Sequence, residues 1–317
     1  MNTARQTSEP IVAEGDIAVN LQSFRRSLRT NRSPRTIQTY TEAVEQLIRF
    51  LAERGMPLVV ANVTREHIDE FILSIQKRWK PATAANRYRA LQAFFKYLGE
   101  EGELPGGSPM VNMRPPRVPD EPPDMLREED LKRLLRTCET GTSFEDRRDA
   151  ALMRVFIDTG ARLSEVTDLR WDPSDVEVND VDLEQGRLRV LGKGNRWRVV
   201  SIGNKAVRCL DRYLRRRAQH SGARAPWLWL GNRGRMTPSG VRQMFWRRGE
   251  QAGLGKVHPH QLRHSAAHMW LAEGAGESDL MRLMGWRSRS MLDRYGRTAA
   301  TERALAAHKR YGLGDRL

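Results

Sequence analysis

Cysteine is nearly absent from this 317-residue chain, which has only Cys138 and Cys209. Two thiols are too few for a disulfide framework or for a zinc site built on thiolates, so we expect both to be buried and reduced. The opening MNTARQTSEP has no apolar core of the length that a signal peptide needs, and no run of about 18 apolar residues occurs. The sequence therefore predicts a cytoplasmic protein without a membrane segment.

Acidic residues are fewer than basic ones. The chain has 39 Asp and Glu against 54 Lys and Arg, a net charge of +15. Such an excess of positive charge favours a polyanionic partner, and nucleic acid is the first candidate. A membrane surface is the other polyanion, but the basic residues are scattered along the chain and do not gather beside an apolar anchor. We therefore expect a DNA-binding, nucleoid-associated protein.

Proline marks a domain boundary. Seven of the fifteen prolines lie between Pro105 and Pro123, which predicts an extended linker over residues 105–124. Residues 1–15 are polar and without pattern, and we expect a flexible arm there. The linker then separates a domain at 16–104 from a second domain at 125–317.

Apolar residues repeat with a helical period throughout the first domain. Apolar residues recur at helical spacing from Ile17, after Ser33-Pro34, after Thr64 and after Pro81, which predicts four amphipathic helices. The second domain mixes helical segments with two β-rich runs, 187–191 and 197–202, joined by the turn Gly192-Lys-Gly-Asn195. The predicted fold class is mainly α (α+β), with an all-helical first domain and a small antiparallel β-sheet in the mostly helical second domain.

Four of the seven histidines fall between His258 and His268, so a metal site has to be considered. His260 and His264 have the i, i+4 spacing of a zinc-protease helix, but Gln261 stands where that motif needs its glutamate. Arg263 would also place a fixed positive charge beside the cation. We expect no metal at this segment.

A nucleotide loop is the second alternative, because Gly192-Lys193 resembles part of a phosphate-binding loop. The Walker pattern would need glycine at 187 and Ser or Thr at 194, where this chain has Arg187 and Gly194. We therefore expect neither ATP nor another cofactor.

His260 and Arg263 remain, i and i+3 on one predicted helix, so that their side chains can converge on one ligand. The arginine fork matches phosphodiester oxygens, and imidazole exchanges protons near neutral pH. Taken singly, each of these residues is more often structural or a solvated charge. The pair suits phosphate chemistry.

Read together, the spacings resemble those of the tyrosine recombinase (phage integrase) family. Thr159-Gly-Ala-Arg-Leu-Ser-Glu165 resembles the box with the first catalytic arginine, and Gly192-Lys-Gly-Asn-Arg196 resembles the hairpin with the catalytic lysine. His260-Gln-Leu-Arg263 matches the His-x-x-Arg box, Leu283-Met-Gly-Trp286 matches the Leu-Gly-His/Trp box, and a tyrosine follows nine residues later. By this resemblance the catalytic residues are Arg162, Lys193, His260, Arg263 and Trp286 with the nucleophile Tyr295, and Glu165 supports the first arginine.

The resemblance also implies a function. It implies a site-specific DNA recombinase that cuts and rejoins strands through a 3′-phosphotyrosyl link without metal or ATP, as a homotetramer on double-stranded DNA. Residues 16–104 then correspond to the SAM-like core-binding domain, with Arg35 and Arg87 as expected DNA contacts, and residues 299–317 to an exchange segment that docks in cis or in trans. A type IB topoisomerase and a non-catalytic DNA-binding regulator are the alternatives.

Trp286 departs from the commonest family pattern. Most members have histidine there, although Cre-type recombinases also have tryptophan. Indole donates one N–H but cannot shuttle a proton. The group that accepts the Tyr295 proton is therefore open, with His260 first in line.

Overall fold

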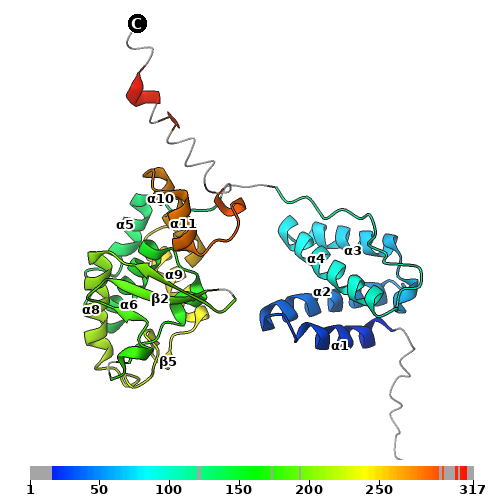
Figure 1. The fold of residues 1–317 in the computed structure, drawn as a ribbon, viewed down its shortest axis with the longest axis horizontal. Helices are drawn as coiled ribbons and strands as arrows, with labels where there is room; N and C mark the ends of the chain where they lie inside the picture. Colours follow the sequence, from blue (N-terminus) through cyan, green and yellow to red (C-terminus); the bar gives the residue numbers. More distant parts are fainter. Residues whose placement is uncertain are drawn as a thin grey trace, which may run out of the picture. The chain divides into compact units, whose positions relative to one another are not determined.

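The computed structural model describes residues 16–119, 123–172, 174–192, 194–292, 295, 304–305 and 308–312. The expected arm (1–15), Lys193 and most of the expected exchange segment (299–317) lie outside these ranges. The chain forms two compact units, Met1–Asp120 and Glu121–Leu317, each of which has its own core (Figure 1). The predicted fold class is confirmed: the elements are mainly helices, with a small antiparallel sheet in the second unit.

Over residues 16–119 the first unit is a bundle of four α-helices and one 3-10 turn. Its elements are α1 (Ile17–Leu28), α2 (Pro34–Glu53), η1 (Val60–Asn62), α3 (Arg65–Arg78) and α4 (Pro81–Glu100). The Asp16 carboxylate accepts the Ala18 N–H at the start of α1, and the Ser33 hydroxyl accepts the Thr36 N–H at the start of α2. Such caps satisfy N–H groups that have no partner inside the helix. The sequence-predicted starts are therefore the observed ones.

The beginning of the proline-rich segment packs against this bundle. Met110 is buried in its core with Leu104, and Met113 packs at the edge of the same cluster. The Tyr88 hydroxyl donates to the Met113 carbonyl at 2.8 Å. Residues 105–113, which composition assigns to the linker, are thus attached to the first unit.

The second unit combines seven helices with assigned bounds, a three-stranded sheet and a two-stranded ribbon. The helices are α5 (Glu128–Arg136), α6 (Phe144–Thr159), α7 (Leu163–Thr167), α8 (Asn204–Arg217), α9 (Pro238–Gln251), α10 (Pro259–Ala272) and α11 (Glu277–Met284), with a 3-10 turn η2 (Val176–Val178). The strands are β1 (Val181–Asp182), β2 (Arg187–Gly192) and β3 (Arg196–Ser201), in the order β1-β2-β3, and β4 (Leu230–Gly231) with β5 (Gly234–Arg235). Helix α6 packs against both α8 and α10.

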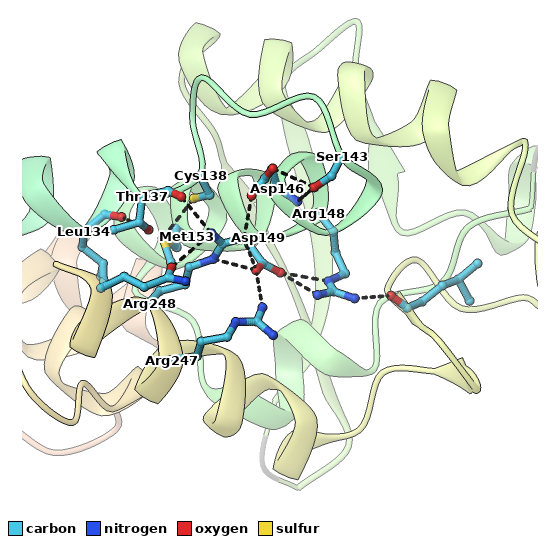
Figure 2. A network of polar contacts seen from close by, with 12 residues as sticks. Leu134, Thr137, Cys138, Ser143, Asp146, Arg148, Asp149, Met153, Arg247 and Arg248 are labelled. Carbon is cyan, nitrogen blue, oxygen red and sulfur yellow. Dashed lines mark hydrogen bonds and ion pairs between the residues drawn. The ribbon is translucent and has the colours of Figure 1, made fainter.

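A buried ionic network joins α6 to α9 (Figure 2). Asp149 on α6 is fully buried, and its carboxylate accepts hydrogen bonds from Arg148, Arg247 and Arg248. Arg248 also reaches Asp146 at 2.8 Å and the Thr137 carbonyl at 2.7 Å. A buried carboxylate needs such partners, because an unpaired charge in the interior is strongly unfavourable.

In the described parts of the chain, no helix combines the length and the apolar character that crossing a membrane requires.

Candidate active site

A glycine turn at the end of α6 brings the first arginine into place. Gly160 has φ +53°, in the left-handed region where glycine is favoured. A Cβ at this position would also lie 2.4 Å from the Met284 Cε atom. The turn leads directly into Arg162, which caps α7.

Arg162 and Glu165 are joined at the start of α7 by a backbone hydrogen bond and a side-chain ion pair. The Arg162 backbone N–H donates to Glu165 Oε2 at 2.7 Å, and its Nη1 donates to Oε1 at 2.8 Å. Arg162 Nη2 also donates to the Gly285 carbonyl at 3.5 Å. The Arg162 side chain stays 33% exposed while that of Glu165 is only 2% exposed, so the arginine is anchored and still accessible.

Arg198, on β3, is a third member of this cluster that the sequence reading missed. Its Nη1 and Nη2 donate to Glu165 Oε1 and Oε2 at 2.9 and 2.8 Å, and its Nε donates to the Leu283 carbonyl at 3.0 Å. Burial raises the pKa of Glu165, but the hydrogen bonds and charges of Arg198 and Arg162 outweigh burial and lower that pKa to about 2. The Glu165 side chain is therefore a carboxylate anion near neutral pH.

This low pKa predicts an acid-sensitive fold. A carboxylate whose folded pKa lies below its ordinary 4.5 adds stability that is complete above that value and is lost as the pH falls toward 2. The size is roughly 3 kcal/mol. We expect Glu165→Gln to be less stable near neutral pH and to lose less free energy of unfolding than wild type below about pH 5.

Urea unfolding followed by tryptophan fluorescence measures this difference, because seven of the eight tryptophans lie in the second unit. Glu184 is exposed, and Glu184→Gln is the matched control, which should behave as wild type does. An E165Q curve parallel to that of wild type across the acid range would contradict the expectation.

Helix α10 presents the next two predicted residues. Arg263 is buried, and its Nη1 and Nη2 donate to the carbonyls of Gly160 (2.5 Å) and Met284 (2.8 Å). Burial and the nearby Arg162 lower the pKa of Arg263 to about 10, so it remains a cation near neutral pH. His260 lies on the first turn of α10, and desolvation together with the charges of Arg263 and Arg162 lowers its pKa. The imidazole is therefore neutral near pH 7 and can accept a proton.

Trp286 and Tyr295 pack in a small apolar cluster beside Arg263. Their rings stack with centroids 5.1 Å apart, and the Arg263 guanidinium lies over the Trp286 ring at 5.8 Å. The Tyr295 side chain is 2% exposed, and its hydroxyl hydrogen-bonds His264 Nδ1. The sequence reading places Tyr295 at the site but did not foresee this contact with His264.

The predicted catalytic residues that the structure describes thus come together from four parts of the chain: the start of α7, α10, the turn after α11, and position 295. Within the described ranges, no group of three or more His, Cys, Asp or Glu side chains is arranged to hold a metal ion. Residues 124–302 match the phage integrase family, and residues 21–102 match the phage integrase N-terminal SAM-like domain.

The chain belongs to the phage integrase family. As a family member it is a tyrosine-type site-specific recombinase. Two similar proteins are both named tyrosine recombinase XerC. That of Chromohalobacter salexigens is 33% identical over 87% of this chain and 90% of its own, and that of Oceanobacillus iheyensis is 30% identical over 84% and 86%.

Solved structures share the fold of this recombinase. XerH bound to a palindromic difH substrate in a post-cleavage complex aligns with TM-score 0.71 and 20% identity, covering 91% of this chain and 83% of XerH. A lambda integrase tetramer bound to a Holliday junction aligns with TM-score 0.66 and 16% identity, covering 90% and 83%. At these identities the likeness concerns the fold alone.

Three further predicted residues of the recombinase remain. Lys193 is outside the described residues, although β2 and β3 form the expected hairpin on either side of it. Arg35 is exposed on α2, whereas the Arg87 side chain is only 14% exposed and is tied to α2 through the Thr39 carbonyl (3.4 Å) and Glu42 (3.9 Å). The Arg35 side chain is therefore more accessible to DNA than that of Arg87. A DNA contact by either residue stays a prediction.

Proposed function

We propose that this recombinase cuts and rejoins double-stranded DNA at specific sites through a 3′-phosphotyrosyl link on Tyr295, without metal or ATP. The observation that carries the proposal is the convergence of Arg162, Arg263 and His260 beside the Trp286–Tyr295 pair. The nearby Arg198 adds a third guanidinium, and Glu165 is the carboxylate that these arginines surround. A cluster with net positive charge suits a phosphodiester that gains negative charge in its transition state.

Each residue then has a role in the transfer. Arg162 and Arg263 bind the non-bridging oxygens, because a guanidinium has five N–H donors and the contacts described above leave donors over on both. The Tyr295 oxygen attacks phosphorus, the bond to the 5′ oxygen breaks, and Lys193 protonates that leaving oxygen. The Trp286 N–H donates to the phosphate. Return of a 5′-hydroxyl reverses these steps and reseals the strand, so that no external energy source is consumed.

The proton of Tyr295 needs an acceptor. A phenol has a pKa of about 10, so it is a weak nucleophile near neutral pH unless a base assists it. His260 fits this role because its lowered pKa keeps the imidazole neutral at that pH. Attack also requires the Tyr295 hydroxyl to leave His264 and reach the phosphate, since the side chain is buried in this conformation.

Recombination joins two duplexes, so the proposed active assembly is a homotetramer on paired DNA sites. The lambda integrase neighbour is a tetramer on a Holliday junction, which supports this assembly by analogy of fold. The net charge of +15 predicts DNA affinity that falls steeply with salt. The segment 299–317 is proposed to dock either on its own domain or on a neighbouring protomer.

Covalent trapping tests the proposal. A random-sequence duplex library is incubated with the protein, stopped with SDS, and the protein-linked fragments are sequenced to find the preferred site. A nicked suicide substrate of that site should then give a covalent adduct, because the short cleaved fragment diffuses away and cannot be rejoined. We expect the adduct to form in EDTA and without nucleotide, and protease digestion to leave DNA linked to the peptide that contains Tyr295.

The outcomes separate the alternatives. No adduct with any library fragment, or adducts that need a divalent metal or ATP, would refute the proposed chemistry. Exchange between two sites on one plasmid is expected of a recombinase. Relaxation of the plasmid without exchange would indicate a topoisomerase.

A further inference from the structure

Arg198 bonds directly to one of the two groups that hold Arg162 and lies against the other. The Arg162 side chain has two anchors, Glu165 Oε1 and the Gly285 carbonyl. Arg198 donates to both carboxylate oxygens of Glu165 and to the carbonyl of Leu283, two residues before Gly285. The planar guanidinium of Arg198 thereby fixes the carboxylate and the last turn of α11 at the same time.

Two glycines make room for this guanidinium. A Cβ at Gly285 would lie 3.3 Å from Arg198 Nη1, and a Cβ at Gly192 would also lie 3.3 Å from the same atom. The guanidinium therefore lies close against the backbone of β2 and of the turn after α11. A lysine has one ammonium group and cannot match three acceptors in one plane.

We propose that Arg198 is a positioning residue for cleavage, which sets Arg162 at the angle that the scissile phosphate requires. This inference rests on the proposed function, since Arg162 is there assigned to bind the phosphate. Arg198 need not touch DNA in this role. Its effect reaches the phosphate through Glu165, the 283–285 turn and then Arg162.

A double-mutant cycle tests this route. In single-turnover cleavage of the nicked suicide substrate, Arg198→Ala is expected to lower the rate by about 10–100-fold, because small misplacements of a clamp group have effects of this size. DNA affinity, measured by fluorescence anisotropy, should fall far less than the cleavage rate does. In an Arg162→Ala background the same R198A change should lower the rate by less than about threefold, because the group it positions is gone.

The matched control is Arg187→Ala, an exposed arginine on the same hairpin with no contact to Glu165, and it should cleave at the wild-type rate. If R198A is poorly folded by thermal melting, R198K takes its place in the same cycle, with the same expected pattern. Equal losses in both backgrounds, or a wild-type rate for R198A, would overturn the inference while the proposed function stands. If the wild-type protein itself forms no adduct, both the proposed function and the positioning role of Arg198 are refuted.

Discussion

Replacing Tyr295 with phenylalanine is expected to abolish the covalent DNA adduct. The change removes one oxygen, the atom proposed to attack phosphorus, and loss of a nucleophile lowers a rate by at least about 10⁴-fold. The fold should tolerate the change, because the phenyl ring keeps its stacking on Trp286 at 5.1 Å. The hydroxyl contact with His264 is lost, at a cost of about 1 kcal/mol. The measurement is adduct formation on the nicked substrate, beside DNA binding by anisotropy.

A second tyrosine in the same unit supplies the control. The Tyr213 hydroxyl is buried, donates to the Leu228 carbonyl and accepts the Leu230 N–H. Tyr213→Phe therefore loses two buried hydrogen bonds and should be less stable than Y295F, yet it should still form the adduct. An adduct that persists in Y295F would assign the nucleophile to another residue.

Asp149→Ala is expected to destabilise the second unit by about 3–5 kcal/mol, the usual size when one partner of a buried ion pair is removed. The carboxylate is fully buried and accepts from three arginines, two of which are themselves buried (Figure 2). Without it, Arg148 keeps the Leu230 carbonyl, and Arg248 keeps Asp146 and the Thr137 carbonyl. Of these two buried cations, Arg248 then keeps one carboxylate and Arg148 keeps none. Urea unfolding followed by tryptophan fluorescence gives the difference.

Arg247 provides the control for this network. Its side chain is 51% exposed, although it contacts the same carboxylate at 2.9 Å. An exposed ion pair contributes little, so Arg247→Ala should change the free energy of unfolding by less than about 1 kcal/mol. A loss in R247A as large as that in D149A would mean that burial is not what makes Asp149 important.

Local signals made much of the fold predictable from the sequence. Ser33-Pro34 begins α2 because the hydroxyl caps the helix and proline suits its first turn, and Gly160 ends α6 by adopting a left-handed conformation. The Gly-Lys-Gly-Asn turn gives the β2–β3 hairpin, with Gly192 paired to Arg196. Each of these features depends on a few neighbouring residues, so the pattern is visible in the sequence.

Long-range polar contacts were not predictable in this way. Arg198 bonds to a carboxylate 33 positions away and to a carbonyl 85 positions away, and among 54 Lys and Arg nothing local distinguishes it. Asp149 and Arg248 are likewise brought together only by the packing of α6 against α9. The His264 contact of Tyr295 is also tertiary, since spacing placed the tyrosine at the site without fixing its side-chain direction.

The burial of Tyr295 has a consequence for fidelity. In the proposed mechanism Tyr295 cannot cut DNA while it stays buried, so the protein can meet many phosphates without cleaving them. If exposing the phenol costs about 2.7 kcal/mol, then roughly one molecule in a hundred has its hydroxyl exposed at a given moment. Cleavage at unselected sites is then lowered about 100-fold. A DNA site that stabilises the exposed conformer recovers that factor, and other sequences do not. The contact between Tyr295 and His264 would then add discrimination to whatever the base contacts supply.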